Sequence, residues 1–322
     1  MVGAHRMRGI AGAVGIGLFM QAAGVALAQT AAEQPAERML HHSGAVRSYL
    51  VYAPPATRKR GAFLPPVLMV LHGGGGGARQ IMTFTRFNPI AAREGVVVLY
   101  PQGLDRGWND GREFQGRDTN KDDVGFLLAV VGDVERQGIE IDRAAIGVTG
   151  ISNGGFMAMR MACEAAGHIA GIAAVTAAMP AETGARCRPA RAVPVLVING
   201  THDPMVPYEG GQVRAFFRNR GAVWSTGRTA EFWASVNGCI GVPRSAALAD
   251  LDPSDGTITI RHDYQGCRRA PVTLLEVQGG GHTWPGGSQY LPTGLVGRVS
   301  RDFDAGEAIL AFFKSVWRAT AN

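Results

Sequence analysis

Seven runs of apolar residues predict the β-strands of this chain. They fall at residues 47–54, 66–73, 95–101, 145–150, 169–177, 193–200 and 272–278. Most are apolar at consecutive positions rather than at alternate ones, which is typical of strands covered on both faces. The pattern therefore predicts a largely parallel sheet with helices packed against both of its faces.

Helical periodicity occurs in the segments between these strands. It is found at residues 122–138, in the segment after Ser152, at 228–238 and at 304–319, where Asp304 and Glu307 have capping-box spacing. Strands that alternate with helices predict an α/β fold with a doubly wound, mostly parallel sheet and helices on both faces. Residues 205–270 are expected to carry an insertion or lid over the carboxyl ends of the strands.

The first 28 residues are typical of an export signal. Arg6 and Arg8 precede a long apolar stretch, and small residues at Ala26 and Ala28 suit cleavage. A retained membrane anchor is the alternative, but the many glycines and alanines make the stretch weakly hydrophobic. We expect a signal peptide over 1–28, a flexible segment over 29–44 and one domain over 45–320, secreted or periplasmic and free of the membrane after cleavage.

Export changes the interpretation of the four cysteines, because disulfides form in oxidising compartments. Three pairings of the four are possible. We expect the sequence-local one, Cys163 with Cys187 and Cys239 with Cys267. Each bridge would then contribute roughly 3 kcal/mol in the chain-entropy model. A metal site is the weaker interpretation, because neither CxxC nor HxxxH spacing occurs.

Charge adds little to this picture. The formal net charge is +6, and 46% of the residues are hydrophobic against 18% charged, which is ordinary for a globular protein. The basic residues are scattered, with no run longer than the three at 58–60. A solvated basic surface explains them better than a nucleic-acid site, so no nucleic-acid partner is expected.

A candidate nucleophile lies between a predicted strand and a predicted helix. Residues 150–154 read Gly-Ile-Ser-Asn-Gly, which matches the G-x-S-x-G nucleophile elbow. In that turn the serine hydroxyl is exposed at the carboxyl end of the strand, and glycines are needed where the chain packs closely. Ser152 is therefore the candidate nucleophile, with Gly150 and Gly154 as the glycines of the tight turn.

A serine nucleophile needs a base and an acid that orients the base. Asp203 follows the predicted strand at 193–200, and His282 follows the predicted strand at 272–278. The resulting order of serine, aspartate and histidine is the one used by α/β hydrolases. Other histidines and aspartates are less suitable because of their positions in the chain. His262 lies within a segment of alternating polarity, and His202 precedes the acid. None of the remaining aspartates considered follows a buried strand; these are Asp250, Asp252 and Asp263.

Hydrolysis through a tetrahedral intermediate also needs two backbone N–H groups that bind the oxyanion. Gly73–Gly77 follow an early predicted strand, where this fold places one donor. We expect the amides of Gly74 and Asn153 to form the oxyanion hole. A phosphate-binding loop is the competing interpretation, but neither Gly-Lys-Ser/Thr nor a spaced G-x-G-x-x-G follows.

The whole set of motifs resembles a known family. The motifs, in chain order, are LHGGGGGA, LYPQG, GWND, DDVGFL, GISNGGFMAMRMAC, NGTHDPMVPYEGG, FWASVNGC and GGGHTWPGG. They are similar to those of the secreted polyhydroxybutyrate depolymerases and feruloyl esterases within the α/β hydrolases, over about residues 45–318. The resemblance implies an α/β-hydrolase catalytic domain, the roles given above for Ser152, Asp203 and His282, and substrate contacts by Trp284 and Trp108.

The expected activity is hydrolysis of carboxylic esters in polymers or their fragments, without a metal or organic cofactor. A serine peptidase or an acyltransferase on the same fold stays open, and so does a non-catalytic polymer-binding protein. Enzymes that act on the solid polymer commonly carry a separate binding module, and the sequence suggests none after the last predicted helix. Soluble hydroxybutyrate oligomers and feruloyl or acetyl sugar esters are therefore the expected substrates, ahead of crystalline polymer.

Overall fold

The computed structural model describes residues 34–320, except for residues 59–63, 117, 216–217 and 269. The signal peptide predicted at residues 1–28 lies outside this part of the chain. Among the described residues, ten strands form one sheet in the order β1-β2-β4-β3-β5-β6-β7-β12-β11-β10. Their bounds are β1 Ala36–His42, β2 Ala45–Tyr52, β3 Val67–Leu71, β4 Val97–Pro101, β5 Ile146–Ile151, β6 Gly171–Val175, β7 Val195–Gly200, β10 Arg244–Ala247, β11 Ile258–Asp263 and β12 Val272–Gln278.

The centre of this sheet is parallel, as the continuous apolar runs predict. Strands β4, β3, β5, β6, β7 and β12 pair parallel with one another, whereas β1 and β2 on one side and β11 and β10 on the other pair antiparallel. All seven predicted strands are confirmed, as β2 to β7 and β12. The doubly wound α/β fold is therefore the fold of this chain.

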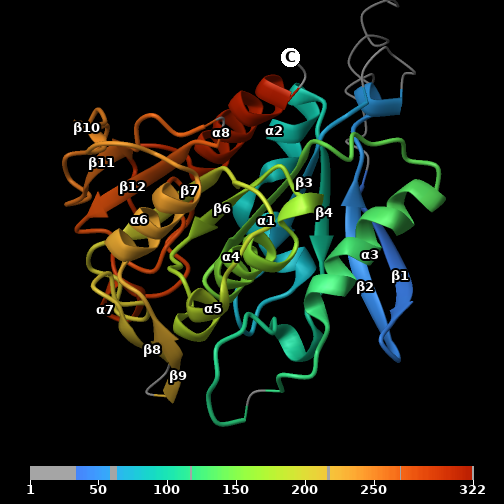
Figure 1. The fold of residues 1–322 in the computed structure, drawn as a ribbon, viewed down its shortest axis with the longest axis horizontal. Coiled ribbons are helices and arrows are strands. Elements are labelled where there is room, and N and C mark those ends of the chain that lie inside the picture. Colours follow the sequence, from blue (N-terminus) through green and yellow to red (C-terminus); the bar gives the residue numbers. More distant parts are fainter. Residues whose placement is uncertain (1–33, 59–63, 117, 216–217, 269, 321–322) are drawn as a thin grey trace, which may run out of the picture. The chain divides into compact units, whose positions relative to one another are not determined.

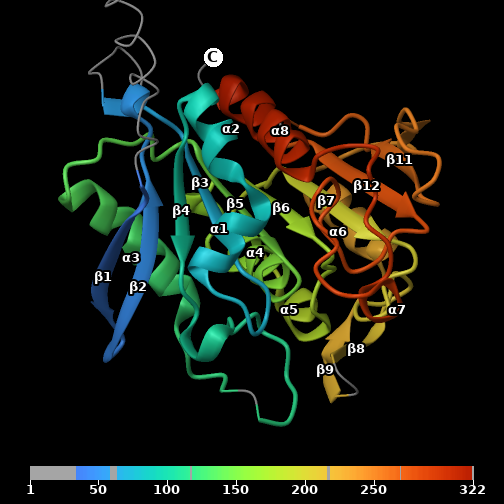
Figure 2. The ribbon, with the colours of Figure 1, turned by 180° about the vertical axis from the view of Figure 1, so that it is seen from behind.

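Helices cover both faces of the sheet. Figure 1 shows α3, α4 and α6 on the near face, and Figure 2 shows α1, α2 and α8 on the opposite face. The helices are α1 Ala78–Thr85, α2 Phe87–Glu94, α3 Asp123–Arg136, α4 Asn153–Glu164, α5 Ala181–Arg186, α6 Thr226–Val236, α7 Thr293–Val296 and α8 Ala305–Thr320, with single 3₁₀ turns at Pro55–Arg58, Leu104–Arg106 and Ala166–His168. The four predicted helices are confirmed as α3, α4, α6 and α8.

The alternation of side chains along each strand gives the sheet two separate hydrophobic cores. Strand β3 directs Val67, Met69 and Leu71 into the core under α3, α4 and α6, and Leu68 and Val70 into the core under α1, α2 and α8. Because successive side chains of a strand point to opposite faces, a strand buried on both sides must be apolar at every position. This requirement explains the continuous apolar runs.

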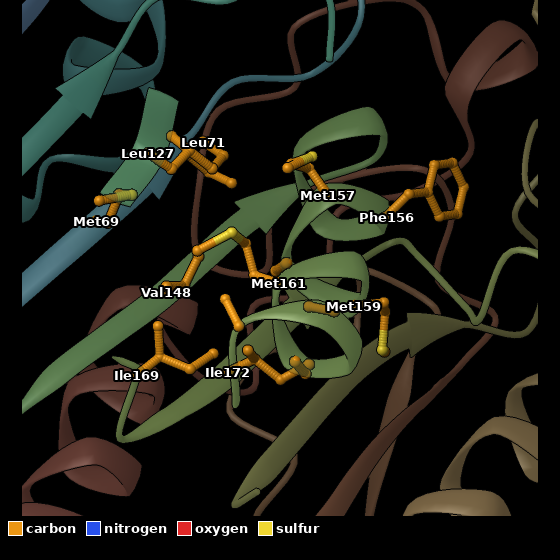
Figure 3. Close-up of a cluster of buried hydrophobic side chains, with 14 of the residues drawn as sticks. Met69, Leu71, Leu127, Val148, Phe156, Met157, Met159, Met161, Ile169 and Ile172 are labelled. Atoms are coloured by element: carbon orange, nitrogen blue, oxygen red, sulfur yellow. The ribbon is translucent and has the colours of Figure 1, made fainter. Parts of the chain in front are cut away.

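The methionine-rich helix α4 packs tightly at the centre of the first core. Figure 3 shows Met157, Met159 and Met161 of α4 among the side chains of the neighbouring strands. All three methionines are buried. Methionine is unbranched and flexible, so it fills the irregular space between a helix and a twisted sheet. The helix that follows Ser152 is thereby held firmly against β5 and β6.

The start of α8 confirms one half of the predicted capping box. The Oδ1 of Asp304 accepts a hydrogen bond of 3.0 Å from the backbone N–H of Glu307. The carboxylate of Glu307 does not complete the box, because it accepts a hydrogen bond of 2.7 Å from Arg93 instead. Asp304 thus caps the helix, and Glu307 joins α8 to α2.

The predicted flexible segment at 29–44 is wrong for its second half. Residues Ala36–His42 form β1, which pairs along its full length with β2. Adjacent Met39 and Leu40 with flanking charges gave no alternating pattern, yet Leu40 is buried and Met39 is exposed, as a strand requires. The ordered domain therefore begins before residue 45.

The predicted insertion or lid at 205–270 also needs correction. Only its first part, with the hairpin of β8 (Gly211–Ala215) and β9 (Arg218–Val223), borders the cavity described below. The rest belongs to the body of the domain: Trp233 of α6 is buried in the core, and β11 and β10 extend the sheet beyond β12. The apolar face of α6 has its packing partner in the sheet.

Candidate active site

Ser152 sits on a sharp turn between the end of β5 and the start of α4. Its backbone adopts φ 55° and ψ −121°. A Cβ at Gly150 would lie 2.5 Å from the carbonyl carbon of Gly154, and a Cβ at Gly154 would lie 2.3 Å from the carbonyl oxygen of Leu71. Only glycine fits at either position, as the sequence predicted. The turn is held to the next strand by the N–H of Ser152, which donates to Val175 at 2.9 Å.

Asp203 and His282 lie after β7 and β12 and form a buried pair. Nδ1 of His282 is 2.7 Å from Oδ2 of Asp203, and the exposed fractions of the two side chains are 6% and 3%. The other oxygen of Asp203 accepts from the backbone N–H groups of Met205 and Val206 at 2.7 and 2.8 Å. With Nδ1 donating to the carboxylate, Nε2 of His282 is left to act as an acceptor.

Ser152 and His282 line the same cavity, which has a volume of about 910 Å³. In the described part of the chain, the Ser152 hydroxyl makes no hydrogen bond with the imidazole. Catalytic hydrogen bonds are often long in a ligand-free enzyme and shorten when substrate binds. Of the three residues predicted for the chemistry, His282 and Asp203 are thus paired directly, and Ser152 lines the same cavity as His282.

The glycine loop lies beside the first turn of α4. A Cβ at Gly74 would be 3.7 Å from Cβ of Asn153, so these two residues are close neighbours. The N–H of Gly75 donates to Arg106 at 2.7 Å, and that of Gly76 donates to Gly73 at 3.0 Å. The N–H groups of Gly74 and Asn153 have no hydrogen-bond partner among the described residues. The two amides predicted to bind the oxyanion thus have no competing partner in the described part of the chain.

His72 is a functional residue that the sequence reasoning missed. Its Nδ1 is 2.8 Å from the carbonyl oxygen of Gly73, and its Nε2 accepts from the N–H of Gly103 at 3.0 Å. Burial lowers the pKa of this imidazole, which keeps it neutral. A neutral ring with one donor and one acceptor ties the glycine loop to the neighbouring loop at 102–107. Its position next to the glycine run was the available signal.

The side chain of Asn153 fastens a second loop to the elbow. Its Oδ1 accepts from the N–H of Trp108 at 2.8 Å, and its Nδ2 donates to the carbonyl oxygen of Trp108 at 3.0 Å and to the carboxylate of Asp110. Asp110 also forms a buried ion pair with Arg112 at 2.7 Å. The GWND motif and the residue after the nucleophile are thus one connected, buried network.

The two tryptophans proposed for substrate contact differ in their surroundings. Trp108 borders the cavity, but only 1% of it is exposed and its indole N–H donates to the carbonyl oxygen of His72 at 2.9 Å. The prediction for Trp284 is wrong: it is 1% exposed, does not line the cavity, and packs edge-on against Phe87 in the core with α1 and α2. Burial of this large, apolar indole in the core stabilises the fold more than exposure to the cavity would.

Two other aromatic residues line the cavity near His282. Phe84 and Tyr290 meet edge to face at 5.6 Å between ring centres. The hydroxyl of Tyr290 donates to the carbonyl oxygen of His282 at 2.8 Å, and burial raises the pKa of Tyr290 to about 12. The sequence reasoning missed both residues because neither lies in a recognisable motif.

A second serine, histidine and carboxylate set occurs at the edge of the sheet. Ser245 of β10 is 2.7 Å from Nδ1 of His262, whose Nε2 is 3.1 Å from Glu276. These side chains stand on three adjacent strands, and none of them lines the cavity. No elbow or glycine loop accompanies Ser245. The set is a cross-strand ladder of polar side chains, in agreement with the rejection of His262 on sequence grounds.

Both predicted disulfides are confirmed. Cys163 in α4 is bonded to Cys187 just after α5, and Cys239 is bonded to Cys267. The first bridge joins the helix behind Ser152 to the segment that follows β6. In the described residues, no helix is long and apolar enough to cross a bilayer. In the same residues, no group of three or more His, Cys, Asp or Glu side chains could hold a metal ion.

The sheet order and the turn that carries Ser152 define the class: the chain has the α/β-hydrolase fold. Residues 117–219 match the family described as "Phospholipase/Carboxylesterase". The acetyl xylan esterase from Aspergillus awamori has a similar fold, with a TM-score of 0.57 and 12% identity over 87% of this chain and 99% of that one.

Curated relatives give a more specific assignment. The "Putative esterase NocK" of Nocardia uniformis subsp. tsuyamanensis is 31% identical over 284 residues, which cover 84% of this chain and 80% of NocK. "Feruloyl esterase B" of Piromyces equi is 28% identical over 224 residues, 67% of this chain but only 39% of the relative. The chain therefore belongs to the phospholipase/carboxylesterase family of α/β hydrolases, and it is a carboxylic ester hydrolase. The predicted resemblance to feruloyl esterases is confirmed.

Proposed function

We propose that the chain is an exported serine esterase that cleaves esters derived from polymers, with Ser152 as nucleophile, His282 as base and Asp203 as the orienting acid. The observation that carries the proposal is the buried hydrogen bond of 2.7 Å between Asp203 and His282, because His282 lines the same cavity as Ser152. A carboxylate on Nδ1 leaves Nε2 as a proton acceptor and stabilises the imidazolium formed during the reaction.

The reaction proceeds through an acyl-enzyme. His282 takes the proton of Ser152 as the hydroxyl oxygen attacks the ester carbonyl, and the amides of Gly74 and Asn153 bind the oxyanion. His282 then protonates the departing alcohol. Water repeats the sequence on the acyl-enzyme and releases the acid. His72 and the Asn153 side chain act indirectly, because they hold the loops on either side of the oxyanion site.

The cavity suits an ester larger than a simple acetate. Its volume of about 910 Å³ lies near the upper end for small-molecule sites, and Phe84 and Tyr290 give it an aromatic wall. Fragments with an aromatic acid, a sugar or a hydroxyalkanoate chain fit that description. Two disulfides suit an oxidising compartment, which supports export to the periplasm or the medium.

Replacement of the nucleophile tests the proposal. Ser152→Ala should lower kcat for p-nitrophenyl butyrate by roughly 10⁴- to 10⁶-fold while the circular dichroism spectrum stays native, because the acyl-enzyme cannot form. His282→Ala should be similarly damaging. Ser245→Ala and His262→Ala are matched controls, since they break a serine–histidine pair outside the cavity. A folded Ser152→Ala enzyme with most of its activity would refute the assignment.

A further inference from the structure

The described residues that line the cavity carry an excess of positive charge. The basic side chains among them are Arg106, Arg112, Lys121 and Arg220, and the carboxylates are Asp105 and Asp118. A charge that faces a partly enclosed cavity is screened less than one on the open surface. Whether the cavity attracts anions therefore depends on which of these basic groups are paired with a carboxylate.

Two of the four basic groups have carboxylate partners. Arg112 is neutralised by the buried Asp110, with contacts of 2.7 and 3.1 Å. Lys121 lies 2.6 Å from Asp105. Arg106 and Arg220 have no ion pair with any described carboxylate. Among the described residues, the side chain of Arg106 makes a single hydrogen bond, of 3.3 Å, to the carbonyl oxygen of Gly76.

Asp118 does not neutralise either arginine. It is exposed, and its Oδ1 accepts a local hydrogen bond of 2.9 Å from the N–H of Asn120. Arg106 is itself exposed beside the glycine loop, so water solvates its charge. Arg220, in contrast, is half-buried. A half-buried guanidinium with no counter-ion among the described residues is the basic group of this cavity that gains most from a bound anion.

The structure also fixes where Arg220 stands. Nη1 of Arg112 donates to the carbonyl oxygen of Arg220 at 2.7 Å, and a Cβ at Gly221 would be 2.9 Å from Cβ of Arg112. The guanidinium of Arg220 lies 5.5 Å from the ring centre of Phe114. Strand β9 is thus packed directly onto the ion pair of Arg112 and Asp110.

The ion pair of Arg112 and Asp110 also connects strand β9 to the residue after Ser152. Asp110 accepts from the side chain of Asn153, the residue after Ser152. The chain of contacts from the elbow to Arg220 therefore passes through two buried side chains, Asp110 and Arg112. Such a connection places Arg220 in a defined position relative to the site of chemistry, because buried polar networks have one satisfied arrangement.

We propose that Arg220, beside Phe114, binds a carboxylate of the substrate, so that the enzyme prefers esters of carboxylate-bearing fragments to neutral esters. The inference rests on the proposed function of Ser152. A guanidinium presents two parallel N–H donors that match a carboxylate, and an aromatic neighbour limits its motion. Hydroxyalkanoate oligomers with a free acid end carry such a group, whereas acetyl and feruloyl sugar esters do not.

Matched substrates that differ only in charge test the preference. The linear dimer of 3-hydroxybutyric acid, whose carboxylate lies in the alcohol part of the ester, is compared with its uncharged terminal carboxamide. Mono(p-nitrophenyl) glutarate, whose carboxylate lies in the acyl part of the ester, is compared with its uncharged carboxamide. We expect at least one acid to exceed its amide in kcat/KM by roughly tenfold, the size of one charge-assisted hydrogen bond.

Substitution assigns that preference to a residue. In Arg220→Gln the ratio of kcat/KM for the acid to kcat/KM for the amide should fall to about one. The hydrogen bond from Arg112 is kept, because it is accepted by the backbone oxygen of residue 220. Arg218→Gln is the control, because it removes the same charge from the same strand outside the cavity. The wild-type preference should also shrink as salt is raised.

Three outcomes would overturn the inference: equal kcat/KM for acid and amide in both pairs, a preference retained in Arg220→Gln, or an equal loss in Arg218→Gln. Failure of the proposed function gives a different result. In that case the Ser152→Ala variant would still hydrolyse the ester bond of the uncharged carboxamide substrates, whatever the effect of charge.

Discussion

Ser152 has a backbone conformation that a residue with a side chain seldom adopts. Its φ of 55° and ψ of −121° are costly, and such outliers persist where the surroundings enforce them. Here the enforcing contacts are the hydrogen bond of its N–H to Val175 and the close packing of Gly150 on Gly154. The Ser152 side chain makes no capping hydrogen bond to helix α4.

His72 provides a prediction at the scale of single residues. Burial lowers its pKa in the folded state, whereas in the unfolded chain the pKa is about 6.5. Below pH 6.5 the unfolded state therefore binds the proton first, and the stabilisation by neutral His72 is lost as pH falls. We expect the difference in unfolding free energy between wild type and His72→Asn to be largest near pH 8 and to shrink towards pH 5.

Urea denaturation at a series of pH values measures this difference. Because the other histidines are common to both proteins, the comparison isolates His72. A difference that is constant from pH 8 to pH 5, or one that grows as pH falls, would contradict the account of a neutral, buried imidazole that holds the glycine loop.

At the scale of elements, β5 and α4 approach so closely that the turn between them tolerates no added carbon. The approach is set by β3, whose last carbonyl group lies directly against Gly154, and by the methionines of α4 that pack on the sheet. Helix, strand and turn are therefore one rigid unit, and the position of the Ser152 hydroxyl depends on all three.

Gly154→Ala tests this dependence. The new Cβ would lie 2.3 Å from the carbonyl oxygen of Leu71, which is backbone and cannot easily move. We expect a loss of roughly 2 to 3 kcal/mol in unfolding free energy, and a fall in kcat beyond what the lower stability explains. Gly167→Ala is the control, because nothing lies within 4 Å of a Cβ there. A stable, fully active Gly154→Ala enzyme would refute the tight elbow.

The disulfides belong to the scale of the whole molecule, since each closes a loop across separate elements. The bridges span 24 and 28 residues in sequence, so each should contribute about 3 kcal/mol by restricting the unfolded chain. Protein produced by export and unfolded in denaturant should show no reactive thiol before reduction and four after it. Reduction should lower the melting temperature.

Thiol titration measures the number of reactive thiols, and calorimetry measures the change in melting temperature on reduction. Non-reducing peptide mapping then identifies the pairs. A thiol in the unreduced protein, or a link between Cys187 and Cys239, would contradict the arrangement of the two bridges.

The sequence by itself determined the parts of this protein that follow from local pattern. The parallel centre of the sheet was predictable because strands buried on both faces must be apolar throughout. Ser152, Asp203 and His282 were predictable as candidates because each follows a buried strand, and parallel strands bring their carboxyl ends to one edge of the sheet.

Only the tertiary structure decided which side chains face the cavity. Trp284 adjoins the loop of His282 in sequence but is buried in the core, whereas Phe84 and Tyr290, from distant segments, form the aromatic wall. The sequence also did not reveal that Asp110 pairs with Arg112, or that Arg220 has no carboxylate partner in the described part of the chain. Loops and sheet edges have no periodic pattern, so the direction of their side chains depends on packing against residues far away in the chain.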